Sequence, residues 1–175
     1  MDNVQPPREP VISTEQIHKR VLELGRQITE EYAGKRLVLL GVLNGAFIFA
    51  ADLCRAIDLD LEVDFIRVAS YGAATVSSGT IRLIKEPGID LAGKEVLLVE
   101  DIVDTGTTMA WLRDHFRTSQ AQSVRICALI DKKERRKVVV DVDYVGFDLD
   151  RGFLVGYGLD YAERYRNLKA IYSLD

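Results

Sequence analysis

Cysteine and histidine are scarce in this chain. Its 175 residues include two cysteines, Cys54 and Cys127, far apart among apolar neighbours, and two histidines, His18 and His115, within predicted helices. The cysteines lack the spacing of a disulfide framework or a zinc site, so we interpret both as buried free thiols. The histidines belong to no motif that indicates a metal ligand or a base, and we assign them no role.

Long apolar runs and an excess of basic residues are also missing. No segment approaches the roughly 18 apolar residues of a membrane span, and residues 1–10 carry acids and prolines in place of a basic, apolar start. The formal net charge of -4 disfavours general affinity for nucleic acid or an anionic membrane, because both attract an extended basic face. We therefore expect a cytoplasmic protein that binds neither nucleic acid nor membranes.

The hydrophobic pattern predicts a single α/β domain over residues 1–175. Hydrophobic residues make up 47% of the chain, enough for a sizeable core, and no linker or repeat divides it. Residues 13–16 resemble a capping box, and apolar residues recur at helical spacing from there to Gly34. Further patterns predict strands at 37–43, 61–70, 80–85, 95–102, 124–130, 144–149 and 153–157, and helices at 46–57 and 109–117. This alternation predicts a central, largely parallel sheet flanked by helices.

The most informative segment is Val96–Thr108, in which a buried strand leads into a loop rich in acids and threonines. Ligands of open parallel sheets bind at the carboxyl ends of the strands. A helix that begins here offers free N–H groups, and together with Gly106 and the nearby threonine hydroxyls it makes a cradle for a phosphomonoester. Glu100 and Asp101 can accept hydrogen bonds from two neighbouring hydroxyls, as a ribose supplies. The segment therefore indicates a site for ribose 5-phosphate.

Two other interpretations of this segment are weaker. Acids at the end of a strand can simply cap the next helix, but that does not account for the whole run from Glu100 to Thr108. Hydrolysis of a nucleoside triphosphate needs the pattern Gly-x-x-x-x-Gly-Lys-Ser/Thr, which is absent.

Residues 96–108 closely resemble the phosphoribosyl-pyrophosphate motif of the type I phosphoribosyltransferases. That motif has four apolar residues, two acids, two apolar residues and then Asp-Thr-Gly-x-Thr, and this chain matches it throughout. Other segments resemble the hypoxanthine-guanine branch of the family, in the same order along nearly the whole chain: 43–45, 64–67, 70–71, 129–132, 145–147, 153–161 and Arg166. The resemblance implies the type I phosphoribosyltransferase fold, with a small hood formed by the N- and C-terminal segments. It also implies Mg²⁺-dependent transfer of the 5-phosphoribosyl group from 5-phosphoribosyl-1-pyrophosphate to hypoxanthine or guanine, a purine salvage reaction, by a homodimer or homotetramer.

The resemblance also implies roles for individual residues. Asp104 would be the catalytic residue, a general base at N7 of the purine. The substrate-binding residues would hold the 5-phosphate (Thr105, Gly106, Thr107, Thr108), the ribose (Glu100, Asp101), the pyrophosphate (Leu43, Asn44, Gly45, Arg166), the base (Lys132, Phe153, Leu154) and the covering loop (Ser70, Tyr71). The metal ligands would be Asp160, Glu100 and Asp101.

Without the resemblance, several of these residues have plainer interpretations. Lys132 would be a solvated lysine at the head of the basic run 132–137, Phe153 and Leu154 would be core residues, and Asp160 and Arg166 would be surface charges. We interpret the remainder of that basic run as a solvated face.

Two further features bear on how the substrate would be held. Asn44 stands where the family commonly has lysine, so a side-chain charge on the pyrophosphate is lost while a backbone grip remains. Residues 71–79 are small and polar, which suits either a lid over the reacting centre or a hairpin tip.

Two other classes of function compete with the transferase. A regulatory protein on the same fold would bind a pyrimidine-operon transcript, but it needs an extended basic face, and the basic residues here cluster at 132–137. A signalling module could use Glu100 and Asp101 as an acidic phosphoacceptor pocket, but this leaves residues 104–108 and 153–160 without a purpose.

Overall fold

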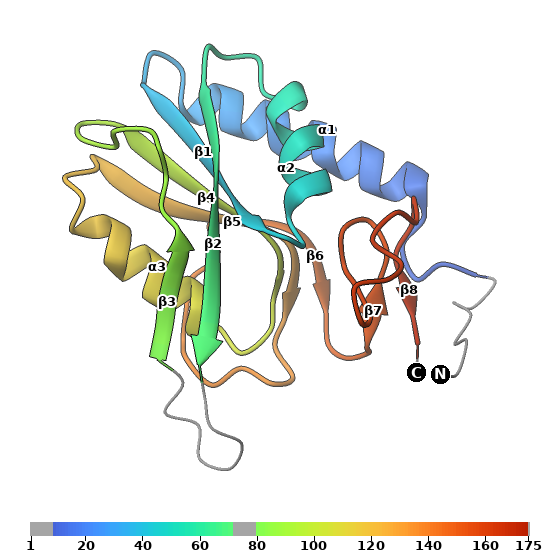
Figure 1. Ribbon diagram of the computed structural model, residues 1–175. Coiled ribbons are helices and arrows are strands. Elements are labelled where there is room, and N and C mark those ends of the chain that lie inside the picture. The colour runs from blue at the N-terminus through green and yellow to red at the C-terminus, as the bar shows by residue number, and fades with distance from the viewer. Residues whose placement is uncertain (1–8, 72–79, 175) are drawn as a thin grey trace.

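A six-stranded sheet forms the centre of the protein in a computed structural model that describes residues 9–71 and 80–174 (Figure 1). Its strands are β1 (Leu37–Leu43), β2 (Glu62–Tyr71), β3 (Thr80–Lys85), β4 (Glu95–Val103), β5 (Ser123–Lys132) and β6 (Tyr144–Leu149). They lie in the order β3-β2-β1-β4-β5-β6, and every neighbouring pair is parallel except β2 and β3. The predicted α/β class with a largely parallel sheet is confirmed.

Helices cover both faces of this sheet (Figure 1). The helices α1 (Thr14–Glu31) and α2 (Phe47–Ala56) share one core cluster with alternate residues of the central strands, among them Leu39 and Leu97. On the other face α3 (Thr107–Arg117) packs in a second cluster with the residues between them, such as Leu40 and Leu98. The central strands are apolar on both faces because both faces are covered.

Local signals place most of these elements within a few residues. The Ser13 hydroxyl accepts a hydrogen bond from the Gln16 backbone N–H, and the Gln16 side chain accepts one from the Ser13 backbone N–H, so the predicted capping box is present. The largest extensions beyond the predicted bounds are at α3, which begins at Thr107, and at β5, which continues to Lys132. The extra residues of α3 include Thr107, predicted to bind the phosphate, and those of β5 include Lys132, predicted to bind the base.

The C-terminal segment departs from its predicted single strand at 153–157. Only β7 (Leu154–Val155) is extended, and it pairs with a second short strand, β8 (Tyr172–Ser173). The strand ends there because Gly156 and Gly158 have φ values of 101° and 102°, which turn the backbone in a conformation that glycine adopts without strain.

The two ends of the described chain meet beside this small sheet. Ile12 forms an antiparallel bridge with Ile171, and the C-terminal segment, red in Figure 1, lies beyond the carboxyl ends of the parallel strands. The predicted hood of N- and C-terminal segments is therefore confirmed. No helix within residues 9–71 and 80–174 is long and apolar enough to cross a membrane.

Tyr157→Phe should destabilise the protein by loosening this hood. The buried Tyr157 hydroxyl donates a 2.6 Å hydrogen bond to Asp52 Oδ2 on α2, and hydrogen bonds to charged groups contribute about 1.5–3 kcal/mol. The variant should lose about 1–2 kcal/mol in urea unfolding, because Asp52 is partly solvated and retains its ion pair with Arg55. Tyr161→Phe, at a side chain that is 46% exposed, is the control. If the two variants are equally stable, the hydrogen bond between Tyr157 and Asp52 does not stabilise the hood.

Candidate active site

A polar cavity of about 180 Å³ opens where β4 meets α3. Its lining includes five of the residues predicted to bind ribose 5-phosphate, together with the predicted base: Glu100, Asp101, Thr105, Gly106, Thr108 and Asp104. The structure therefore gathers the strand end and the start of the helix around one space. Thr107, also predicted to hold the phosphate, is the exposed first residue of α3 and does not line the cavity.

Gly106 lets the chain turn directly from β4 into α3. It is the N-cap of the helix with φ of 80°, and an added Cβ would lie 2.4 Å from the carbonyl oxygen of Val138. No side chain caps this helix end, although the Thr107 N–H lies 3.4 Å from the Thr105 hydroxyl. Apart from this long hydrogen bond of Thr107, the first turn of α3 can offer backbone N–H groups to an anion, and the helix dipole favours negative charge there.

Glu100 and Asp101 are buried next to each other, 8% and 9% exposed. Each accepts a backbone hydrogen bond, Glu100 from Asp101 and Asp101 from Ile102, at 3.2 Å and 2.9 Å. Burial raises the pKa of Glu100 well above its usual value, and the neighbouring carboxylate of Asp101 raises it further. Burial also raises the pKa of Asp101. The pair is therefore ready to accept hydrogen bonds or a cation that would stabilise its charged form.

Two chain segments are layered on Asp101, the loop at Gly45 first and the segment at Gly158 on top of it. An added Cβ on Gly45 would lie 1.8 Å from Asp101 Oδ2, and an added Cβ on Gly158 would lie 2.0 Å from the Gly45 carbonyl oxygen. The preceding Leu43–Asn44 peptide bond is cis, and Asn44 is exposed. The predicted pyrophosphate loop thus lies between the acidic strand end and the C-terminal segment.

Arg166 joins this stack from the C-terminal segment. Its guanidinium donates to the Gly158 carbonyl oxygen at 2.8 Å and pairs with Asp160 at 2.8 Å and Glu163 at 2.9 Å. It also lies close enough to Asp101 to offset part of the rise in that residue's pKa. Neither Arg166 nor Asp160 is a fully exposed surface charge, because their side chains are 19% and 29% exposed.

The two carboxylate oxygens of Asp104 have different surroundings. Its Oδ1 is buried and has no hydrogen-bond partner among the described residues, whereas Oδ2 lies 3.5 Å from an Arg135 guanidinium nitrogen. An unpartnered buried carboxylate oxygen is costly in a protein interior and is often explained by a function. This oxygen is suited to accept a proton or a hydrogen bond from a ligand in the cavity.

The predicted base-binding residues gather at the end of β5. Lys132 has a side chain that is only 8% exposed, and its Nζ donates to the Gly152 carbonyl oxygen at 2.8 Å. Phe153 is 46% exposed and meets Tyr161 edge to face at 5.6 Å between ring centroids, while Leu154 is buried. The interpretation of Lys132 as a solvated lysine is wrong, and so is that of Phe153 as a core residue.

Ser70 and Tyr71 end β2 beyond the same edge of the sheet, but their side chains are not described. Residues 72–79 of the predicted lid lie outside the described residues, so the lid stays a prediction.

Sequence patterns missed Arg136, which we had assigned to a solvated basic face. Its side chain is 17% exposed and contacts the site loop from behind. The signal that could have indicated this is slight, namely a basic residue shortly after the acidic end of a buried strand.

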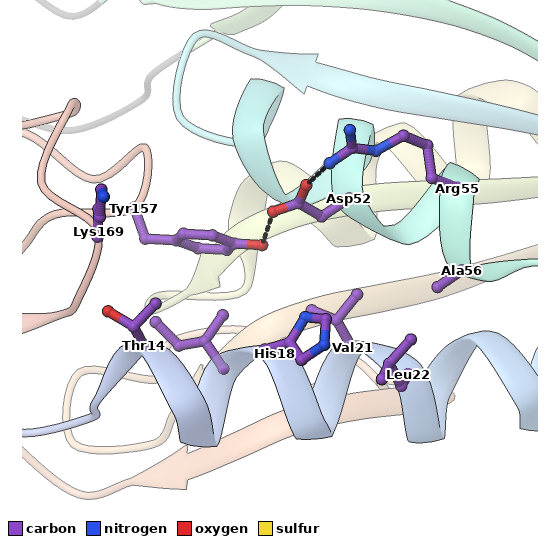
Figure 2. Close-up of a pocket in the computed structure, with 10 residues that line it drawn as sticks. Thr14, His18, Val21, Leu22, Asp52, Arg55, Ala56, Tyr157 and Lys169 are labelled. Atoms are coloured by element: carbon purple, nitrogen blue, oxygen red, sulfur yellow. Dashed lines mark hydrogen bonds and ion pairs between the residues drawn. The ribbon is translucent and has the colours of Figure 1, made fainter.

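A larger cavity of about 420 Å³ lies between α1, α2 and the C-terminal segment (Figure 2). Within it Tyr157 and Arg55 both reach Asp52, and His18 projects from α1 nearby. It shares no lining residue with the cavity at Asp104. Its Asp52 is already bound by Tyr157 and Arg55, whereas the smaller cavity holds the buried carboxylate pair and the predicted base.

Comparison with known proteins identifies the class first. The family model of the phosphoribosyl transferase domain matches residues 13–162, which include the whole acidic and threonine-rich segment.

Individual relatives narrow this class. The hypoxanthine-guanine phosphoribosyltransferase of Bacillus subtilis is 48% identical over 161 residues, covering 92% of this chain and 89% of the relative. That of Mycobacterium avium is 46% identical over 171 residues, covering 94% of this chain and 84% of the relative. A crystal structure of a hypoxanthine-guanine phosphoribosyltransferase from Bacillus anthracis matches with a TM-score of 0.91 and 44% identity, covering 97% of this chain and 99% of that one. The chain therefore belongs to the phosphoribosyltransferases, in their hypoxanthine-guanine branch.

Glu100→Gln should stabilise the free protein at neutral pH. Because burial raises the pKa of Glu100 above 4.5, the folded state holds its proton more tightly than the unfolded state, and ionisation destabilises the fold. This penalty is absent below the unfolded pKa and grows as the pH rises toward the folded pKa. In Mg²⁺-free urea unfolding, parent and variant should be equally stable near about pH 4, and the variant more stable at about pH 7. Glu86→Gln, at an exposed carboxylate, is the control. A variant less stable than the parent at neutral pH would refute this account of the pair.

Proposed function

We propose that the protein transfers the 5-phosphoribosyl group of 5-phosphoribosyl-1-pyrophosphate to hypoxanthine or guanine, giving IMP or GMP and pyrophosphate. The observation that carries the proposal is one polar cavity that contains a buried carboxylate pair beside the uncapped N-terminus of α3. Those groups suit a ribose and its 5-phosphate respectively. The family membership supports the same reaction. It is tested by mixing the protein with 5-phosphoribosyl-1-pyrophosphate, Mg²⁺ and each nucleobase in turn and following nucleotide formation; no nucleotide with either 6-oxopurine would refute it.

The 5-phosphate and ribose occupy the cavity at residues 100–109. Backbone N–H groups of the first turn of α3, with the hydroxyls of Thr105 and Thr108, bind the phosphate. Glu100 and Asp101 accept hydrogen bonds from the ribose hydroxyls. The pyrophosphate lies against the backbone of Leu43, Asn44 and Gly45, and Arg166 supplies a planar fork of donors beside it.

The donor set of the site fits Mg²⁺. Among the described residues no cluster of three or more acidic, His or Cys side chains forms a ready-made cage. Mg²⁺ is commonly held by one or two carboxylates together with water and substrate phosphates, and Glu100 and Asp101 are such carboxylates. Asp160 already accepts from Arg166 and from the backbone of Glu163, which favours contact with the ion through water. When bound, the ion offsets negative charge on the departing pyrophosphate.

Asp104 accepts the proton of the purine in this reaction. Asp104 lines the same cavity as the carboxylate pair, and its buried Oδ1 has no hydrogen-bond partner among the described residues. No nucleophilic side chain is required, because positioning and electrostatic stabilisation support loss of pyrophosphate.

Asp104→Asn should lower kcat by about 10²- to 10⁴-fold, the usual contribution of a general base, with a much smaller change in KM. Initial rates with hypoxanthine at saturating 5-phosphoribosyl-1-pyrophosphate measure this. The matched control is Asp114→Asn, at a carboxylate on α3 that is 68% exposed. A near-normal kcat in the Asp104 variant would remove Asp104 from the chemistry.

Lys132 selects 6-oxopurines. One of its three N–H donors is bound by the Gly152 carbonyl oxygen, which fixes the ammonium and leaves other donors for the 6-oxygen of the base. Phe153 offers an exposed ring for stacking, and the backbone of Leu154 lies next to it. Adenine carries an amino group at the 6-position and lacks the N1 hydrogen of the oxo tautomer, so both contacts lose their partner.

The parent should prefer hypoxanthine over adenine by about 10⁴- to 10⁵-fold in kcat/KM, because adenine leaves buried polar groups unpaired. Lys132→Met should narrow this preference, whereas Lys133→Met, at a lysine 63% exposed, should not. Adenine within about tenfold of hypoxanthine in the parent would overturn the substrate claim, since one charge-assisted hydrogen bond contributes more than that. Equal preference in the parent and the Lys132 variant would keep the substrate class and reject Lys132.

Assembly and location stay predictions. We propose a cytoplasmic homodimer or homotetramer that binds no nucleic acid and no membrane. The basic run does not favour RNA binding, because Lys132 and Arg136 turn inward and leave a smaller basic face than the sequence suggests.

A further inference from the structure

Arg136 lies behind the site loop and contacts the ends of two neighbouring strands. Its Nε donates to the Asp104 carbonyl oxygen at 3.0 Å, and one terminal nitrogen donates to the carbonyl oxygens of Val103 at 3.1 Å and Lys132 at 3.2 Å. The same nitrogen is paired with the Asp131 carboxylate, whose side chain is 8% exposed. One guanidinium therefore binds the residue that carries the proposed base, its neighbour in β4, and the residue that selects the purine.

The chain after Arg136 continues this contact. The N–H groups of Lys137 and Val138 both donate to the Thr105 carbonyl oxygen, at 2.9 Å and 3.1 Å. An added Cβ on Gly106 would lie 2.9 Å from Arg136 Cδ. Residues 136–138 thus form an outer layer against the phosphate loop, and the tight approach accounts for glycine at 106.

We propose that Arg136 is a positioning residue that fixes Asp104 and the phosphate cradle relative to Lys132. The proposal rests on the proposed function, which gives Asp104 and Lys132 their roles. β4 and β5 are parallel neighbours, and their last paired residues are Val103 and Asp131. Beyond this pair, no pairing between β4 and β5 fixes the distance from Asp104 to Lys132. Arg136 fixes this distance instead, because its rigid guanidinium binds carbonyl oxygens at the ends of both strands.

The chemistry of arginine suits this task. A guanidinium is planar and presents several donors in fixed directions, so it can bind carbonyl groups and a carboxylate together. A lysine could keep the charge pairing with Asp131 but not the spread of carbonyl contacts. Displacement of a reacting group by about 1 Å can cost about 10²-fold in rate, so a loosened loop should affect catalysis even though Arg136 does not line the cavity.

The test compares Arg136→Lys with Arg20→Lys. Arg20 is a matched control, because its guanidinium also donates to two backbone carbonyl oxygens, those of Gly146 and Val145, and pairs with a carboxylate, Glu23, away from the cavity. Arg136→Lys should lower kcat about 10- to 100-fold, weaken ribose 5-phosphate binding in calorimetry about tenfold, and change the KM for hypoxanthine less than about threefold. Arg20→Lys should lose stability in urea without these changes.

Two further measurements separate positioning from folding. In Arg136→Ala, guanidinium at about 50 mM should restore part of kcat, because the free ion supplies the same planar donors. If the substitutions at 136 prevent folding, Asp131→Asn provides the second variant: it removes the carboxylate partner of Arg136, leaves the carbonyl contacts, and should weaken ribose 5-phosphate binding about two- to fivefold.

The outcomes separate the two proposals. In one outcome the parent lacks transferase activity while Arg136→Lys still weakens ribose 5-phosphate binding relative to Arg20→Lys. This result would refute the proposed reaction and support the role of Arg136 in positioning the phosphate cradle. An active parent in which the two lysine variants have equal kcat and equal ribose 5-phosphate affinity would overturn the role of Arg136. Absence of guanidinium rescue together with normal binding by Asp131→Asn would overturn it as well.

Discussion

Glu100 and Asp101 share a buried position at the end of β4, and the site is arranged around the need to stabilise their charge. Burial raises the pKa of both carboxyls, and the neighbouring Asp101 raises the pKa of Glu100 further. The end of β4 is held in place by β5, with which it pairs as far as Val103, whereas its pairing with β1 stops at Val99. The sheet thus stabilises a strand end that would otherwise avoid burial. Ribose hydroxyls and a divalent cation are the partners that relieve this cost, which links the stability of the fold to the proposed substrate.

The surrounding loops follow from the same constraint. Gly45 approaches Asp101 too closely for any side chain, and Gly158 approaches Gly45 in the same way. The C-terminal segment reaches this point because Tyr157 is fastened to Asp52 on α2, the helix that directly follows the loop at 43–45. Helix, loop and C-terminal segment therefore form one unit against the strand end, and a change at the Tyr157 bond acts on the loop through α2.

The sequence allowed prediction of the sheet and of the phosphate cradle, because both depend on local patterns. Continuous apolar runs marked β1 and β4, and the run of acids and threonines after β4 indicated that a helix follows, although α3 begins at Thr107 and not at the predicted 109. Long-range contacts left no such pattern. The short strand β8 has only two residues, and Arg136 looked like one more charge in a basic run until the fold placed Asp131 and three strand-end carbonyl groups around it. The roles given to Asp160 and Lys132 came from family resemblance, since isolated charges carry no local signal of burial.

The departure at Asn44 has a counterpart in the C-terminal segment. An exposed, uncharged Asn44 brings no cation to the proposed pyrophosphate loop. Arg166 does: it binds the Gly158 carbonyl oxygen, Gly158 packs on the Gly45 backbone, and its charge is felt at Asp101, whose pKa it lowers against the effect of burial. Its ion pairs with Asp160 and Glu163 hold it there and partly neutralise it. Positive charge at this loop therefore depends on the C-terminal segment, so the same hood that encloses the site also supplies the cation that the loop itself lacks.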